Sequence, residues 1–304
     1  MARNEKSMPT SSSPPCISFP DLLLVGGAFA KGGAGEVRGG VYFGIDVAVK
    51  LVNRKENEEE HARFLAKLAE ETRLQCLCGR HANILPLLAF NVSDGDQPLS
   101  LIMPRMVTSV FDLIHKPTVP VGFAPGSDYA ALSEGRRLPL RRRLVMLQEL
   151  ASALSYLHGH CKVVHGDIKS HNLLLDPNGC LKLSDFGLSR PVASASSAVE
   201  GGEEDGEVEG SLPWMAPECV LGEEAIDDET SEGRSEDARE HLLFARDVFS
   251  FSVVIVEVVT GQLPYKDMKP QAIMRFLSRG KRLKLRPQLF LASEGGEKIP
   301  VRNS

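Results

Sequence analysis

Four polar side chains in one short stretch have the types needed to move a phosphoryl group. Asp167, Lys169 and Asn172 follow an apolar strand pattern, and Asp185 stands a little further on in Asp-Phe-Gly. A carboxylate at 167 can accept the proton of an attacking hydroxyl, and the ammonium group of Lys169 can neutralise charge on the phosphoryl group. Asn172 and Asp185 offer oxygen ligands of the kind that Mg2+ prefers. We therefore predict a catalytic loop with Asp167, Lys169 and Asn172, and a metal site with Asn172 and Asp185.

A glycine-rich segment near the start of the chain is suited to holding phosphates. Residues 30–37 read Ala-Lys-Gly-Gly-Ala-Gly-Glu-Val, and Lys50 follows in Val-Ala-Val-Lys. Glycine has no Cβ, so backbone amides can approach a phosphate closely. A lysine on the next strand can reach the same phosphates. The predicted phosphate-binding residues are Gly32, Gly33, Gly35 and Lys50.

Lys50 needs a carboxylate partner on the helix that follows, and two neighbours compete for that role. Glu70 has Leu74 one turn later and Leu77 two turns later, so it shares a face with apolar residues that can pack toward a core. Glu71 has a polar residue one turn later. We therefore predict Glu70 as the partner, with Glu71 as the alternative.

A third motif gives the pattern a family resemblance. Residues 211–218 read Ser-Leu-Pro-Trp-Met-Ala-Pro-Glu. With the glycine segment and the catalytic stretch before it, this order resembles protein kinases, in particular the tyrosine-kinase-like group of serine/threonine kinases. The resemblance runs from residue 24 to about residue 285. It implies transfer of the γ-phosphoryl group of ATP, with Mg2+, to serine or threonine hydroxyls of a protein substrate, and a part in signal transduction.

The same resemblance assigns further residues. Asp247 is similar to the helix aspartate that anchors the catalytic loop, and Ser211 to a hydroxyl that bonds the catalytic aspartate and lysine. Gly166 stands where many kinases have an arginine that pairs with an activating phosphate, so we expect activity without phosphorylation of this segment. The residues implied in adenine binding are Met103 as gatekeeper, Pro104 through its carbonyl, Met106 through its amide, and Val37, Ala48 and Leu174 as apolar walls.

The periodicity of apolar residues predicts an α+β, bilobal fold with a β-rich front and a helical back. Strands are expected over 21–52, 84–91 and 99–103, and helices over 56–78, 140–157, 247–259 and 271–279. The predicted organisation is a disordered tail at 1–20, an N-lobe at 21–106, a C-lobe at 107–290 with inserts near 116–138, 191–210 and 222–240, and a tail at 291–304. The resemblance implies a C-lobe shortened at its end, as in a naturally short kinase or an incomplete gene product.

Composition and local sequence features narrow the class of protein further. With 42% apolar and 25% charged residues, the chain can bury a core. The apolar run at 248–259 is too short to span a bilayer and contains Glu257, which favours a buried core helix.

The six cysteines form no zinc spacing, which favours reduced thiols and a cytoplasmic location. Residues 200–209 hold six acids and no base, a pattern typical of solvated loops. Basic stretches lack interleaved aromatics, so no nucleic-acid partner is predicted, and no pattern fixes an oligomeric state.

Two other functions are compatible with parts of the pattern. A nucleotide-binding pseudokinase or signalling scaffold would fit a short C-lobe, although the chemical residues are all present. A small-molecule kinase can carry the same His-Gly-Asp run but lacks the Trp-Met-Ala-Pro-Glu motif. A protein serine/threonine kinase remains the main prediction.

Overall fold

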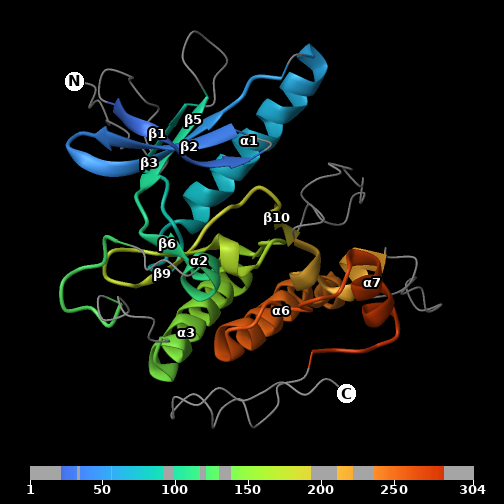
Figure 1. Cartoon of the computed structure of the whole chain (residues 1–304). Helices are drawn as coiled ribbons and strands as arrows, with labels where there is room; N and C mark the ends of the chain where they lie inside the picture. Colours follow the sequence, from blue (N-terminus) through green and yellow to red (C-terminus); the bar gives the residue numbers. More distant parts are fainter. Residues whose placement is uncertain are drawn as a thin grey trace, which may run out of the picture. The chain divides into compact units, whose positions relative to one another are not determined.

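The computed structural model describes residues 22–32, 35–55, 57–91, 99–116, 121–129, 138–192, 211–221 and 236–283. The chain divides into two compact units, one of residues 1–80 and 85–105 and the other of residues 81–84 and 106–304. Gly33, both predicted tails and most of each predicted insert lie outside the described residues. The described part has a β-rich unit followed by a largely helical one, in agreement with the predicted α+β class (Figure 1).

The first unit is built on a five-stranded antiparallel sheet in the order β1-β2-β3-β5-β4. Its strands are β1 (Leu22–Gly32), β2 (Gly35–Tyr42), β3 (Ile45–Val52), β4 (Ala89–Asn91) and β5 (Ser100–Pro104). The strand predicted over 84–91 is therefore limited to its last three residues.

Alternation along the strands separates two cores on the two faces of this sheet. Val47, Val49 and Ile102 are fully buried in one cluster. Leu101 lies on the opposite face, in a second cluster with Leu68 of α1 (Glu58–Cys78). This helix begins at Asn57, whose side chain accepts two backbone N–H groups of the first turn. Helix α1 thereby covers the face of the sheet that also carries Lys50 (Figure 1).

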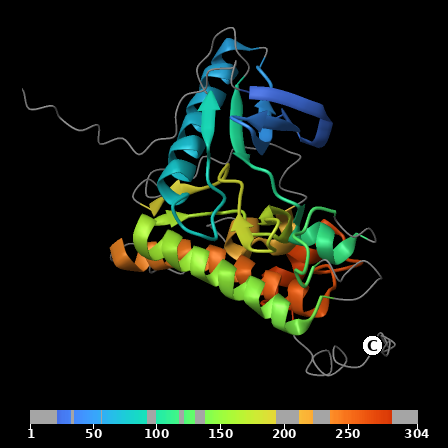
Figure 2. The same cartoon turned by 90° about the vertical axis from the view of Figure 1, so that its left-hand side faces the viewer.

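The second unit contains α2 (Val110–His115), α3 (Leu140–Tyr156), α5 (Pro217–Leu221), α6 (Glu236–Thr260) and α7 (Pro270–Ser278). Helices α3 and α6 pack alongside each other (Figure 1 and Figure 2). The helices predicted over 140–157 and 271–279 are found nearly as expected. The helix predicted over 247–259 is the second half of the longer α6.

Short strands and turns in this unit position the polar loops. β6 (Thr108–Ser109), β8 (Leu173–Leu175) and β9 (Leu181–Leu183) form one small sheet, and β7 (Val163–Val164) pairs with β10 (Arg190–Pro191). A π-helical turn, Leu157–Cys161, follows α3, and 3-10 turns occur at Ser170–Asn172 and Leu212–Trp214. The segments 163–175 and 181–191 are thus connected by β-pairing at both of their ends.

Residues 81–84 belong with the second unit, although they lie within the predicted N-lobe range. Ile84 forms a parallel bridge with Leu183, and the side chain of Asn83 donates to the carbonyl of Leu181 at 3.1 Å. Met106, predicted as the last N-lobe residue, is likewise part of the second unit. These long-range bonds connect residues 81–84 to the second unit, and the predicted domain boundaries stay a prediction.

None of the helices in the described ranges has the length and apolar character required to cross a membrane. The longest of them, α6, has charged and polar residues along its length, including Asp247 and Glu257.

Candidate active site

The three predicted catalytic residues meet in one hydrogen-bonded cluster in the second unit. Oδ2 of Asp167 lies 2.7 Å from Nζ of Lys169 and accepts from Nδ2 of Asn172 at 2.8 Å. Nδ2 of Asn172 also donates to the backbone carbonyl of Asp167 at 2.9 Å. Lys169 in turn donates to Oγ of Ser211 at 2.7 Å. The cluster joins the catalytic loop to the Ser-Leu-Pro-Trp segment through Lys169, which is one of the two partners that the family resemblance implied for Ser211.

A buried aspartate holds the backbone just before this cluster. The two carboxylate oxygens of Asp247 in α6 accept the backbone N–H groups of His165 and Gly166, each at 2.8 Å. The Nε2 atom of His158 lies 2.8 Å from the same carboxylate. The prediction that Asp247 anchors the catalytic loop is therefore confirmed. Hydrogen bonds that backbone N–H groups donate to a charged acceptor are strong, so they fix the loop at this point.

Gly166 has a structural reason for being glycine. Its φ angle is +81°, and a Cβ built there would lie 2.8 Å from the carbonyl oxygen of Leu188. An L-residue is strained at such a φ angle, and the close carbonyl leaves little room for a side chain. Sequence reasoning noted only the missing arginine charge, whereas the structure shows a close approach of two backbone segments.

The two predicted metal ligands are connected through Ser184. Its N–H and its Oγ both donate to the carbonyl of Asn172 at 2.9 Å, and Asp185 is the next residue. Asp185 is exposed with φ of +67°, while Phe186 beside it is buried. The amide nitrogen of Asn172 is used on Asp167, which leaves its side-chain oxygen for a ligand. A carboxylate and an amide oxygen fit Mg2+, whose role when bound would be to neutralise phosphate charge.

In the first unit, Lys50 pairs with Glu71 and not with Glu70, so the predicted choice between them is wrong. Nζ of Lys50 lies 3.1 Å from Oε1 of Glu71. Both oxygens of Glu70 accept instead from Arg73, at 2.7 Å each. The hydrogen bonds from Arg73 lower the pKa of the Glu70 carboxyl below its ordinary value. Glu70 is thus a surface carboxylate with its own partner one turn away.

The error has a physical origin in Gln75 and Leu77. Gln75 is only 2% exposed, and its burial is tolerated because its side-chain amide donates to the carbonyl of Leu85 at 3.2 Å. Leu77 is 48% exposed. The buried face of α1 therefore includes the hydrogen-bonded Gln75 and leaves Leu77 outside. Glu71, one turn before Gln75, lies on this buried face.

Among the remaining nucleotide residues predicted in the first unit, Val37, Ala48 and Met103 lie on the face of the sheet that carries Lys50, and Pro104 lies on the opposite face. Val37 is paired opposite Lys50, and Ala48 opposite Met103. Pro104 ends β5 opposite Val47. Gly35 approaches β3 so closely that a Cβ would lie 2.0 Å from the carbonyl oxygen of Leu51, which excludes any larger residue. Gly32 ends β1 opposite Gly35.

Two predicted adenine-site residues belong to the second unit. Met106 follows the unit boundary, and Leu174 lies in β8 opposite Ser109 of β6. The walls and hinge residues of the predicted nucleotide site thus come from both units, and their role in binding stays a prediction.

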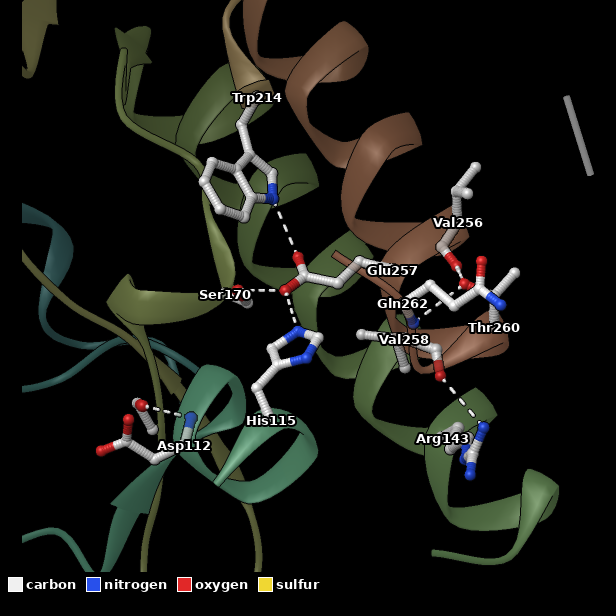
Figure 3. Close-up of polar contacts among 11 residues, drawn as sticks. Asp112, His115, Arg143, Ser170, Trp214, Val256, Glu257, Val258, Thr260 and Gln262 are labelled. Carbon is white, nitrogen blue, oxygen red and sulfur yellow. Dashed lines mark hydrogen bonds and ion pairs between the residues drawn. The ribbon is translucent and has the colours of Figure 1, made fainter. Parts of the chain in front are cut away.

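Sequence reasoning missed a second buried carboxylate near the catalytic loop. Glu257 of α6 accepts hydrogen bonds from Ser170 and Trp214, and the ring of His115 lies against it (Figure 3). The available signal was a single acid in an apolar run. That acid argues against a membrane span, and a charge in a buried helix also requires partners.

An α+β chain with a glycine-rich hairpin, a lysine–glutamate pair and an Asp-Lys-Asn cluster has the features of a phosphotransferase. The chain belongs to the protein tyrosine and serine/threonine kinase family, whose model matches residues 24–291. Serine/threonine-protein kinase CTR1 of Arabidopsis thaliana is 30% identical over 272 residues, which cover 87% of this chain and 28% of that protein.

Other relatives are similar over shorter stretches. Human mitogen-activated protein kinase kinase kinase 13 is 33% identical over 151 residues, 50% of this chain and 13% of that protein. A putative serine/threonine-protein kinase/receptor of Acanthamoeba polyphaga mimivirus is 27% identical over 258 residues, 84% of this chain and 13% of that protein. The chain thus spans between 13% and 28% of the length of these three relatives.

Proposed function

We propose that this chain transfers the γ-phosphoryl group of ATP to serine or threonine hydroxyls of a protein substrate. The observation that carries the proposal is the cluster in which Lys169 contacts both Asp167 and Ser211. It places a cation within hydrogen-bonding distance of both a carboxylate and a hydroxyl, next to a backbone held by Asp247.

The residues divide the work of an in-line transfer among them. The substrate hydroxyl oxygen attacks the γ-phosphorus, the bond from that phosphorus to the β–γ bridging oxygen breaks, and ADP leaves. The hydroxyl proton passes to Asp167. Both side-chain contacts that the described residues make to this carboxylate fall on Oδ2, which leaves Oδ1 to accept the substrate hydroxyl. Lys169 would neutralise charge on the transferred group.

Substrate class and cofactors follow from the same residues and from the relatives. A lysine two residues after the catalytic aspartate is typical of serine/threonine kinases, and two of the relatives named above carry that activity in their names. Lys50 and the glycine-rich hairpin would hold the phosphates of ATP, and Asn172 and Asp185 would hold Mg2+. Nucleic acid is not expected as a partner.

A cytoplasmic location is part of the proposal. Four cysteines of the described ranges, Cys76, Cys161, Cys180 and Cys219, are free thiols. Free thiols in this number are typical of a reducing compartment.

Transfer of radiolabelled phosphate from ATP to a generic basic protein tests this function. Asp167→Asn should lower turnover by orders of magnitude while ATP binding is kept, because the carboxylate acts in the transition state. Phosphoamino-acid analysis of the product should show phosphoserine and phosphothreonine.

Asp176→Asn is the matched control, since Asp176 is a carboxylate of the same segment with a structural role. Its Oδ1 accepts the backbone N–H groups of Asn178 and Cys180, both at 2.9 Å. This variant should lose stability and keep its turnover. Equal turnover in wild type and Asp167→Asn would contradict the proposed chemistry, and nucleotide binding without any transfer would favour the scaffold alternative.

A further inference from the structure

Glu257 connects three segments of the second unit through one buried carboxylate. Its side chain has 0% exposure, and it lies in the last turns of α6 (Figure 3). Oε1 accepts from Oγ of Ser170 at 2.7 Å and lies 2.9 Å from Nε2 of His115. Oε2 accepts from Nε1 of Trp214 at 2.8 Å. The three partners belong to the catalytic loop, to α2 and to the segment that carries Ser211.

Two separate bonds therefore hold the same pair of segments together. Lys169 contacts Ser211 directly, and the next residue, Ser170, is joined to Trp214 through Glu257. The direct bond involves Lys169, a predicted catalytic residue. The connection through Glu257 involves no predicted catalytic residue, but it fixes Ser170 and Trp214, which lie close to Lys169 and Ser211 in the sequence.

Helix α6 holds the catalytic loop at two points. Asp247 holds His165 and Gly166, and Glu257 holds Ser170. The two carboxylates are ten residues apart on one helix, or about 15 Å along its axis. Arg143 of α3 fixes the end of this helix, because its guanidinium donates to the carbonyls of Val258 and Val259 at 3.3 and 3.0 Å. Asp167 lies between the two held points.

Loss of the Glu257 carboxylate would be costly in free energy. A buried carboxylate is costly unless donors satisfy it, and in the described part of the chain only His115 makes an ion-pair contact with it. Removing the acceptor would leave the N–H of Trp214 and the hydroxyl of Ser170 without their partner in an apolar interior. Each group would then shift to find another acceptor.

We propose that Glu257 is a positioning residue for phosphoryl transfer. It holds the catalytic loop, through Ser170, and the segment that carries Ser211, through Trp214, in one arrangement. The inference rests on the proposed kinase function. Glu257 touches neither nucleotide nor substrate, and it acts through the backbone that carries Lys169, Asn172 and Ser211.

Glu257→Gln tests the proposal with nearly constant side-chain volume. A glutamine can keep its oxygen on Trp214 only if Ser170 and His115 both change from donors to acceptors. We expect kcat to fall about ten- to a hundredfold, the effect of a small misplacement of reacting groups, with little change in the KM for ATP. Ser170→Ala should lower kcat in the same direction, and the double variant should be less than additive.

Thr260→Val is the matched control on the same helix. Thr260 is buried, donates to the carbonyl of Val256 at 2.7 Å and accepts from the N–H of Gln262 at 3.2 Å (Figure 3). This variant should lower the melting temperature and leave kcat unchanged. Wild-type kcat in folded Glu257→Gln would overturn the proposal, as would an equal loss of kcat in Thr260→Val.

Trp214 provides a measurement that does not depend on activity, because it is the single tryptophan of the chain. Its fluorescence quenching by acrylamide should rise in Glu257→Gln and also in Ser170→Ala, whose side chain reaches Trp214 only through Glu257. Quenching unchanged in both variants would overturn the coupling. Absence of phosphate transfer by the wild type would instead reject the proposed function, and the quenching data would still decide whether Glu257 couples the two segments.

Discussion

Nζ of Lys50 lies 3.1 Å from Oε1 of Glu71, while the adjacent carboxylate of Glu70 is held by Arg73 on the surface of the same helix. The Lys50–Glu71 pair is partly buried, with side-chain exposures of 25% and 10%. Two neighbouring acids on one helix thus have different roles, which are set by the faces they occupy.

A double-mutant cycle can separate the two acids. Lys50→Met combined with Glu71→Gln should show a coupling energy of about 1 kcal/mol or more, measured by urea unfolding, because the pair is shielded from solvent. Lys50→Met with Glu70→Gln is the matched control and should be additive. Coupling at 70 and additivity at 71 would contradict the observed pairing.

Ser211→Ala should lower turnover about ten- to a hundredfold, the value of a hydrogen bond to a charged group. Without Oγ, Nζ of Lys169 loses its contact at 2.7 Å and keeps only the one to Asp167. Steady-state phosphate transfer measures the change. Ser211→Thr retains the hydroxyl and should recover most of the activity, and an equally inactive threonine variant would argue for a steric role.

Gly166→Ala should destabilise the second unit by more than the conformational cost alone. That cost is about 1–2 kcal/mol for an L-residue in the left-handed region, and the contact with the Leu188 carbonyl adds to it. Gly261→Ala is the control, because Gly261 has φ of +67° but nothing within 4 Å of a built Cβ. Chemical denaturation of both variants gives the comparison, and an equal or larger loss at 261 would show that the close contact is tolerated.

Stability should fall between neutral pH and about pH 5.5 partly through His81. Burial, and then the charge of Lys182, lower the pKa of this histidine below its ordinary value of 6.5. Its Nδ1 accepts the N–H of Asn83 at 3.1 Å, and its ring stacks on Tyr156, so protonation removes one bond. A lowered folded-state pKa gives stability that is complete above the unfolded value and is lost as pH falls through the folded value.

The measurement is the melting temperature of wild type and His81→Gln at pH 7.5 and near pH 5.5. The variant should lose less stability than the wild type over this interval, since its side chain does not titrate. An identical decrease in both proteins would mean that His81 contributes nothing to the pH dependence.

The catalytic loop could be predicted because its residues are close in sequence. Asp167, Lys169 and Asn172 lie within one turn-like stretch, so their types and spacing already bring them together. The helices at 140–157 and 271–279 were likewise set by local periodicity. Asp247 and Ser211 were found through the family resemblance, although they are distant from the loop in the chain.

The tertiary structure alone decided the partners that depend on which face is buried. Glu71 was only the alternative to Glu70 in the sequence analysis, because a satisfied glutamine lies in the core of α1 and a leucine lies outside, which reverses the apolar pattern of the helix. Glu257 was recognised only as an acid in an apolar run, since its donors come from α2, the catalytic loop and the Trp214 segment. Residues 81–84 lie in the predicted N-lobe range but group with the second unit, because Asn83 bonds to residues about a hundred positions away. A buried polar group is identified by its partners, and those partners meet only when the chain has folded.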